Sequence, residues 1–151
     1  MLVNSKISRV VSIVLVSVSL AACTTTGGYF SPQGSIDAAN LDATAADGVA
    51  ADMVARLAEH VGPGTGTIAL KSDNTAFASA FDKHLRTWGY AVDPAASGGG
   101  AIALAYTVDT ADGQVLARIS TPSVELARSY QTTTTGAVPS SPLSVMTRGK
   151  S

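Results

Sequence analysis

The 151-residue sequence has little of what most functional sites are made from. It contains one cysteine and two histidines, and aromatic residues make up only 5% of it. A single cysteine excludes an intrachain disulfide and any cysteine-cluster metal site. Ten Lys and Arg residues against eleven Asp and Glu give a formal charge of −1, so the dense basic surface that nucleic-acid binding needs is absent. The aromatic residues are too few for a base-stacking platform or a large aromatic pocket.

The usual catalytic patterns are also missing. The sequence holds no H-x-x-x-H and no G-x-S-x-G motif. His60 is expected at the end of one helix and His84 in the middle of another, where capping or solvent exposure explains them better than catalysis. Asp42, Asp47 and Asp52 lie five residues apart, a step of about 140° on a helix, so they form no carboxylate cluster. We therefore expect no catalytic, metal-binding or cofactor-binding residues, no small-molecule substrate and no enzyme activity.

What is present begins with an export signal. Lys6 and Arg9 form a short positive region before an eleven-residue, mostly apolar run, Val10–Leu20. A membrane-spanning helix needs about 20 apolar residues, so this run is too short to span and is typical of a signal peptide. Residues 1–22 are predicted to be this peptide. Their removal leaves 129 residues with a formal charge of −3, because Lys6 and Arg9 are lost.

The signal ends in LAAC at residues 20–23, which resembles the lipobox of bacterial lipoproteins. This resemblance implies cleavage between Ala22 and Cys23 and attachment of lipid to the Cys23 thiol; an ordinary signal peptide with an incidental cysteine is the alternative. At ~0.8 kcal/mol per buried CH₂, two or more acyl chains give a stable anchor. Thr24 stands where an Asp is the familiar inner-membrane retention signal, so we favour the outer membrane, with the domain in the periplasm, over the inner membrane.

Helical periodicity appears twice in the middle of the chain. An apolar residue recurs every fourth position from Val49 to Val61, after capping candidates at Asp42 and Thr44. Gly62-Pro63-Gly64 ends this helix, and the GPGTG segment is interpreted as a turn because it lacks the Gly-Lys-Ser/Thr ending of a phosphate loop. The second helix follows Ser72-Asp73-Asn74 as cap candidates and places Phe77, Phe81, Leu85 and Trp88 on one face. Gly89 is expected as its left-handed C-terminal residue.

The rest of the core has the alternation of β-strands. Short strands are expected at 67–71 and 90–92, and longer ones at 102–108, 115–120 and 124–130. Asp112-Gly113 is a strong hairpin signal. The order α-β-α-β-β-β-β predicts an α+β fold, in which two amphipathic helices pack on a small, mostly antiparallel sheet. Residues 23–41 are predicted to be a lipidated flexible tether, 42–131 the domain, and 132–151 a flexible, disordered tail.

This layout, joined to the lipobox, resembles the TrbH family of conjugal transfer lipoproteins. The resemblance rests on LAAC, on DMVARLAEHVGPGTGTIALK (52–71), on FDKHLRTWGYAV (81–92) and on SPLSVM (141–146). It implies a place in the type IV secretion apparatus of conjugative plasmids, as a small lipoprotein that stabilises the channel during mating-pair formation. The expected partners are other subunits of the channel. No cysteine follows Cys23, so contact with them must be noncovalent, and no direct contact with DNA is expected.

Three functions of different classes remain open at this point. The first is the structural subunit of the transfer channel, which would use the domain or the 141–146 segment, with β-augmentation at an exposed sheet edge as one mode. The second is an envelope lipoprotein that acts as a binding module, such as a mating-exclusion factor. The third is an envelope hydrolase that depends on His60 or His84. We rank them in that order.

Overall fold

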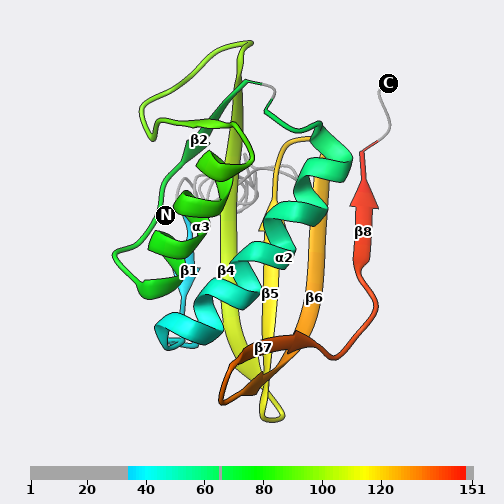
Figure 1. The fold of residues 1–151 in the computed structure, drawn as a ribbon. Helices are drawn as coiled ribbons and strands as arrows, with labels where there is room; N and C mark the ends of the chain where they lie inside the picture. The colour runs from blue at the N-terminus through cyan, green and yellow to red at the C-terminus, as the bar shows by residue number, and fades with distance from the viewer. Residues whose placement is uncertain (1–33, 65, 149–151) are drawn as a thin grey trace, which may run out of the picture.

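The computed structural model describes residues 34–64 and 66–148, and within them it shows two helices packed on a sheet (Figure 1). The signal peptide, the cleavage site and most of the predicted tether lie outside these residues. The elements in chain order are β1 (Ile36–Asp37), α2 (Ala43–Val61), β2 (Thr67–Leu70), α3 (Ala76–Thr87), β3 (Ala91–Val92), β4 (Ala101–Ala111), β5 (Gln114–Ser120), β6 (Val124–Thr133), β7 (Gly136–Pro139) and β8 (Ser144–Thr147). The predicted α+β class with two helices is confirmed.

Helix α2 forms where its sequence signals place it. The Asp42 carboxylate accepts hydrogen bonds from the backbone N–H groups of Thr44 and Ala45, both at 2.9 Å, and so satisfies donors that the helix itself leaves open. Gly62 ends the helix with a φ of 86°, a conformation that favours glycine. The apolar stripe from Val49 to Leu57 is fully buried against the sheet. No helix in the described residues is long and apolar enough to cross a membrane.

Helix α3 differs in detail from its prediction. Its N-cap is Thr75, whose hydroxyl accepts from Ala78 N, one position beyond the three residues expected to cap it. Phe77, Phe81 and Leu85 are buried as predicted. Trp88 instead caps the C-terminus and is 41% exposed, because the helix ends before its side chain can join the buried face. Gly89 has the predicted positive φ, at 91°.

The sheet is mixed, so the expectation of a mostly antiparallel sheet is confirmed only in part. Its main order is β3-β2-β4-β5-β6-β7, with β1 also paired to β4 and β8 to β6. Three pairs are parallel (β1 with β4, β2 with β3, β2 with β4), and four are antiparallel. The parallel pair β2–β3 follows from α3, because a helical crossover returns the chain to the start of the neighbouring strand. Asp112 and Gly113, with φ of 52° and 75°, make the predicted tight hairpin between β4 and β5.

The predictions of a flexible tail and a flexible tether are wrong for the parts of these segments that the structure describes. Strand β6 continues to Thr133, and β7 and β8 pair with its far edge, at residues 130–133 and 124–127 respectively. Two short strands thereby satisfy backbone groups that the long strand β6 would otherwise leave open. At the other end, β1 pairs with β4, and Ala39 and Leu41 pack against the core. Threonine and serine made these segments look like loops, yet threonine also favours strands.

Candidate functional site: a free sheet edge and an outer groove

The structure separates the residues that sequence analysis considered for chemistry. Ala22 and Cys23 lie outside the described residues. His60 is exposed in the last turn of α2. The His84 Nε2 atom lies 3.0 Å from Asp47 Oδ1, and the Lys83 Nζ atom lies 3.2 Å from the same oxygen, so these side chains tie α3 to α2. Hydrogen bonds from Lys83 first and His84 second lower the pKa of Asp47.

Within the described residues, no three Asp, Glu, His or Cys side chains gather as metal ligands, and neither histidine bonds a hydroxyl group. The carboxylates of Asp42, Asp47 and Asp52 point to different partners, as their spacing predicts. Asp42 caps the helix, Asp47 pairs with α3, and Asp52 faces β6. Asp47 and Asp52 thus connect α2 to α3 and to β6.

A polar cluster that sequence analysis missed lies between α2 and β6. Asp52 Oδ2 accepts hydrogen bonds from Arg128 Nη1 at 2.9 Å and from Tyr130 Oη at 2.7 Å. Burial, followed by this hydrogen bond to the carboxylate, raises the pKa of the Tyr130 hydroxyl. Arg128 Nε also donates to the backbone oxygen of Ser141 at 3.0 Å, and Ser129 N donates to Ser141 Oγ at 2.9 Å. The cluster therefore fixes the start of the segment that carries β8.

A second cluster fixes the N-terminal end of the described chain. Asp73 accepts from the Tyr106 hydroxyl at 2.6 Å, from the Thr75 hydroxyl at 2.7 Å and from Asp37 N at 2.6 Å. Partial burial opposes ionisation of Asp73, but these hydrogen bonds prevail and lower its pKa. Asp37 itself is 6% exposed, and its Oδ2 atom has no hydrogen-bond partner among the described residues. Burial first, and the nearby Asp73 charge as well, raise the pKa of Asp37.

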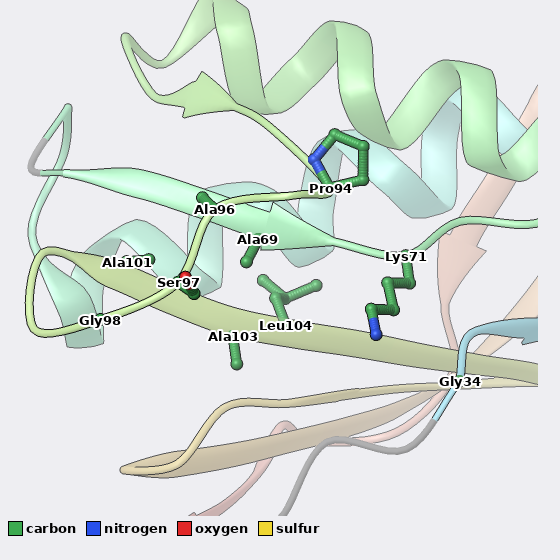
Figure 2. Close-up of a pocket in the computed structure, with 10 residues that line it drawn as sticks. All are labelled: Gly34, Ala69, Lys71, Pro94, Ala96, Ser97, Gly98, Ala101, Ala103 and Leu104. Atoms are coloured by element: carbon green, nitrogen blue, oxygen red, sulfur yellow. The ribbon is translucent and has the colours of Figure 1, made fainter.

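One groove opens on the sheet face opposite the two helices. Its volume is about 560 Å³, and Figure 2 shows Ala69 and Ala103 at its floor, the 94–98 loop at its rim, and Lys71 at the end where Gly34 lies. Ala69 on β2, and Lys71 directly after the strand, alternate with the buried Ile68 and Leu70, so they point to the outer face. The floor consists of small side chains, and Lys71 supplies a cationic group.

The second surface feature is the edge of the sheet formed by β8. All four of its residues are exposed, and Val145 and Met146 keep 42% and 41% of their surface accessible. Val138 on β7, which pairs with the same edge of β6, is 50% exposed. Three of the five exposed large apolar side chains of the described chain therefore lie on these two strands. In Figure 1, β8 lies beside β6 and forms one side of the molecule. Among the described residues β8 pairs with β6 alone, and a strand paired on one side offers backbone donors and acceptors to an extended polypeptide.

Residues 24–149 match the family model described as "Conjugal transfer protein TrbH". A relative from Sinorhizobium fredii (strain NBRC 101917 / NGR234), described as "Probable conjugal transfer protein TrbH", is 48% identical over 111 residues, which cover 69% of this chain and 75% of the relative. No solved structure matches the chain.

Proposed function

The chain belongs to the TrbH family of conjugal transfer proteins, and we propose that it is a lipid-anchored structural subunit of a conjugal DNA transfer apparatus of the type IV secretion class. The observation that carries this proposal is the extent of the family match. It runs from residue 24 to residue 149 and so includes both helices and all eight strands of the part of the chain that the structure describes. The role in conjugal transfer comes from the family, and the stabilising role in mating-pair formation is our proposal.

Anchoring is proposed from the sequence around Cys23. The LAAC sequence at 20–23 follows a short apolar run, and the family match begins at residue 24, directly after the proposed lipidated cysteine. The match therefore covers what would be the mature chain. Thr24 supports placement in the outer membrane with the domain in the periplasm.

The proposed partners are other subunits of the transfer channel, held by noncovalent contact. Cys23 is the only cysteine in the sequence, so once it carries lipid no thiol is left to bridge to a partner. Contact with DNA is not part of the proposal, because the chain without residues 1–22 carries a formal charge of −3. Nor is enzyme activity, since the clusters around Asp52 and Asp73 join elements of the fold.

Two experiments test the two halves of this proposal. Donor cells fed labelled palmitate should label the wild-type protein, and Cys23→Ser should lose both the label and processing after Ala22. Label that persists in Cys23→Ser would contradict the anchor.

For the partners, the tagged wild-type protein should be purified in detergent after crosslinking in donor cells. Recovery together with other transfer subunits is expected, whereas recovery of this chain without any of them would contradict the structural role.

A further inference from the structure

Strand pairing on β4 determines where the chain runs ahead of Gly34. Strand β5 pairs with one edge of β4, while β1 and β2 both pair with the other edge, parallel to β4. Strand β2 occupies this edge up to Leu104, and β1 begins opposite Thr107. Ser35 lies between them, where its Oγ atom accepts a hydrogen bond from Tyr106 N at 3.2 Å. In this register the residue before Gly34 would fall opposite Leu104, so the chain must leave the sheet there.

The inner side of the sheet is already filled at this point. The segment between β2 and α3 passes here, and Asp73 accepts hydrogen bonds from Asp37 N and from the Tyr106 hydroxyl, both at 2.6 Å. Two aromatic rings of α3 pack on Tyr106. The chain ahead of Gly34 therefore leaves over the outer face or past the edge. Gly34 lines the outer groove, at the end where Figure 2 shows Lys71.

The floor of this groove has room for a large apolar side chain. Ala69 and Ala103 face outward, whereas their neighbours Ile68 and Leu104 face the core. A cavity of about 150 Å³ is enough to hold benzene. The groove, with a volume of about 560 Å³, accepts an aromatic ring together with the backbone beside it. Lys71 supplies a cation for the face of such a ring.

The sequence directly ahead of Gly34 carries a side chain that suits this floor. Residues 24–33 read TTTGGYFSPQ and include no charged residue. Phe30 lies four residues before Gly34, a distance that an extended chain spans over up to about 14 Å. Pro32 favours an extended backbone at the residue before it. A phenyl ring also needs no hydrogen-bond partner when buried, unlike the hydroxyl of Tyr29.

We propose that the outer groove holds the N-terminal segment of the same chain. The Phe30 ring lies on Ala69 and Ala103, and residues 31–33 connect it to Gly34. Removal of the ring and the alanine floor from water drives the contact. The docking is a property of the chain itself and does not depend on a role in conjugal transfer.

One consequence does rest on the proposed lipid anchor at Cys23. Docking shortens the free tether from residues 24–33 to residues 24–29. At the length of an extended chain, the domain is then held within about 20 Å of the membrane, compared with about 35 Å for the undocked tether. The outer face of the sheet would be the side closest to the anchor.

Labelling of a cysteine in the groove floor tests the docking in the full-length protein. Donor cells that express Ala103→Cys are treated with N-ethylmaleimide for increasing times, and the remaining free thiol is measured after denaturation by a gel shift with a polyethylene glycol maleimide. Ala127→Cys is the matched control, because Ala127 faces the same side of the sheet from β6, two strands away. Wild type gives the background from Cys23, and immunoblots check the amount of each variant.

The removal of the ring should open the floor to the reagent. Phe30→Ser is expected to accelerate labelling of Ala103→Cys about tenfold, the factor for a groove that is occupied about nine-tenths of the time. Labelling of Ala127→Cys should not change. Tyr29→Ser, which removes the neighbouring aromatic ring, should leave both rates as they are.

A crosslink tests the contact without altering the floor or the ring. Ser31→Cys is combined with Ser97→Cys on the groove rim, and in a control chain with Ala127→Cys. A short, membrane-permeable bismaleimide should join the first pair within one chain, so that both thiols disappear from the gel shift without an increase to the mass of a dimer. The control pair should not be joined, and Phe30→Ser should abolish the crosslink of the first pair.

The opposite results would overturn the proposal. Equal labelling of Ala103→Cys with and without Phe30→Ser does so in either form: fast labelling in both means an open groove, and slow labelling in both means a different occupant. A crosslink from Ser31→Cys that is no stronger to Ser97→Cys than to Ala127→Cys, or that persists in Phe30→Ser, also does so. Conjugal transfer is not measured here, so failure of the docking leaves the proposed function standing.

Discussion

Asp52 connects three parts of the chain through one carboxylate. It lies on α2, bonds Arg128 and Tyr130 of β6, and through Arg128 reaches the backbone of Ser141 ahead of β8. The side chains of Asp52 and Arg128 are each 20% exposed. A charge in that position is costly when its partner is removed, because it keeps little contact with water.

Asp52→Ala is therefore expected to lower the free energy of unfolding by about 2 kcal/mol, the usual scale for losing hydrogen bonds to a charged group. Urea unfolding of the purified domain measures this change. Asp82→Ala is the matched control, because Asp82 also lies within a helix and pairs with an arginine at 2.8 Å, but both side chains are exposed. Its effect should stay within about 0.5 kcal/mol. Equal effects of the two substitutions would contradict the role given to the buried cluster.

Asp37 gives the opposite pH dependence from most carboxylates. Its pKa is raised in the folded protein, mainly by burial, so the native state binds its proton more tightly than the unfolded chain does. The free energy of unfolding therefore loses a contribution as pH rises from the unfolded pKa, about 3.9, through the raised folded value. Asp37→Asn removes this loss while its side-chain oxygen can still accept from Asn40 N.

Stability of Asp37→Asn relative to wild type should consequently increase between pH 3 and pH 7. Urea unfolding at both pH values measures it, and the comparison cancels any pH-independent effect of the new amide. A relative stability that is constant or falls toward pH 7 would show that Asp37 does not carry a raised pKa.

At the scale of elements, β7 approaches α2 closely at Gly48. A Cβ atom added there would lie 3.1 Å from the backbone N and 3.3 Å from the backbone O of Ala137 on β7. Alanine normally stabilises a helix by about 1 kcal/mol relative to glycine. Here the crowded atoms belong to the backbone of β7, which its pairing with β6 keeps in place. The missing side chain of Gly48 therefore lets β7 pack closely against α2.

Gly48→Ala is expected to destabilise the protein by about 1 kcal/mol, because the strain of crowding exceeds the gain in helix propensity. Ala51→Gly, in the same helix and away from full burial, serves as the reference and should lose about 1 kcal/mol from propensity alone. Thermal and urea unfolding measure both. A gain in stability for Gly48→Ala would mean that β7 shifts freely and does not pack on α2 as described.

Elements with local signals were predictable from the sequence. Asp42, Gly62 and Gly89 marked helix ends, and Asp112-Gly113 marked a hairpin, because each acts on the backbone within a few residues of its own position. The pairings of β1, β7 and β8 were not, since short strands with threonine, serine and proline resemble loops until a long neighbour such as β6 offers its edge.

The candidate site likewise has one part that the sequence predicted and other parts that it did not. The SPLSVM segment (141–146) stood out in the sequence as part of the family resemblance, and it includes the first three residues of β8. The cluster that positions it could not be predicted, because Asp52 and Arg128 are 76 residues apart and neither carries a local pattern. Nor could the outer groove, which forms only when β2, β4 and the 94–98 loop come together.

The helices, the groove and the β8 edge lie on different sides of the molecule. Both helices lie on one face of the sheet, the groove opens on the other, and β8 forms an edge (Figure 1). Strand β1 brings the N-terminal end of the described chain to β4, where the Asp73 cluster holds it. A lipid-anchored chain attached at that end would present an edge and an open face to its neighbours, as a structural subunit requires.

Conjugal transfer frequency from a donor with a clean in-frame deletion of the gene tests the central claim most directly. The deletion is complemented in parallel with wild type and with Cys23→Ser, and the amounts of both proteins are checked by immunoblot. A subunit of the transfer apparatus whose anchoring matters predicts a large drop in transfer that wild type restores and Cys23→Ser does not. Unchanged transfer from the deletion strain would contradict the account.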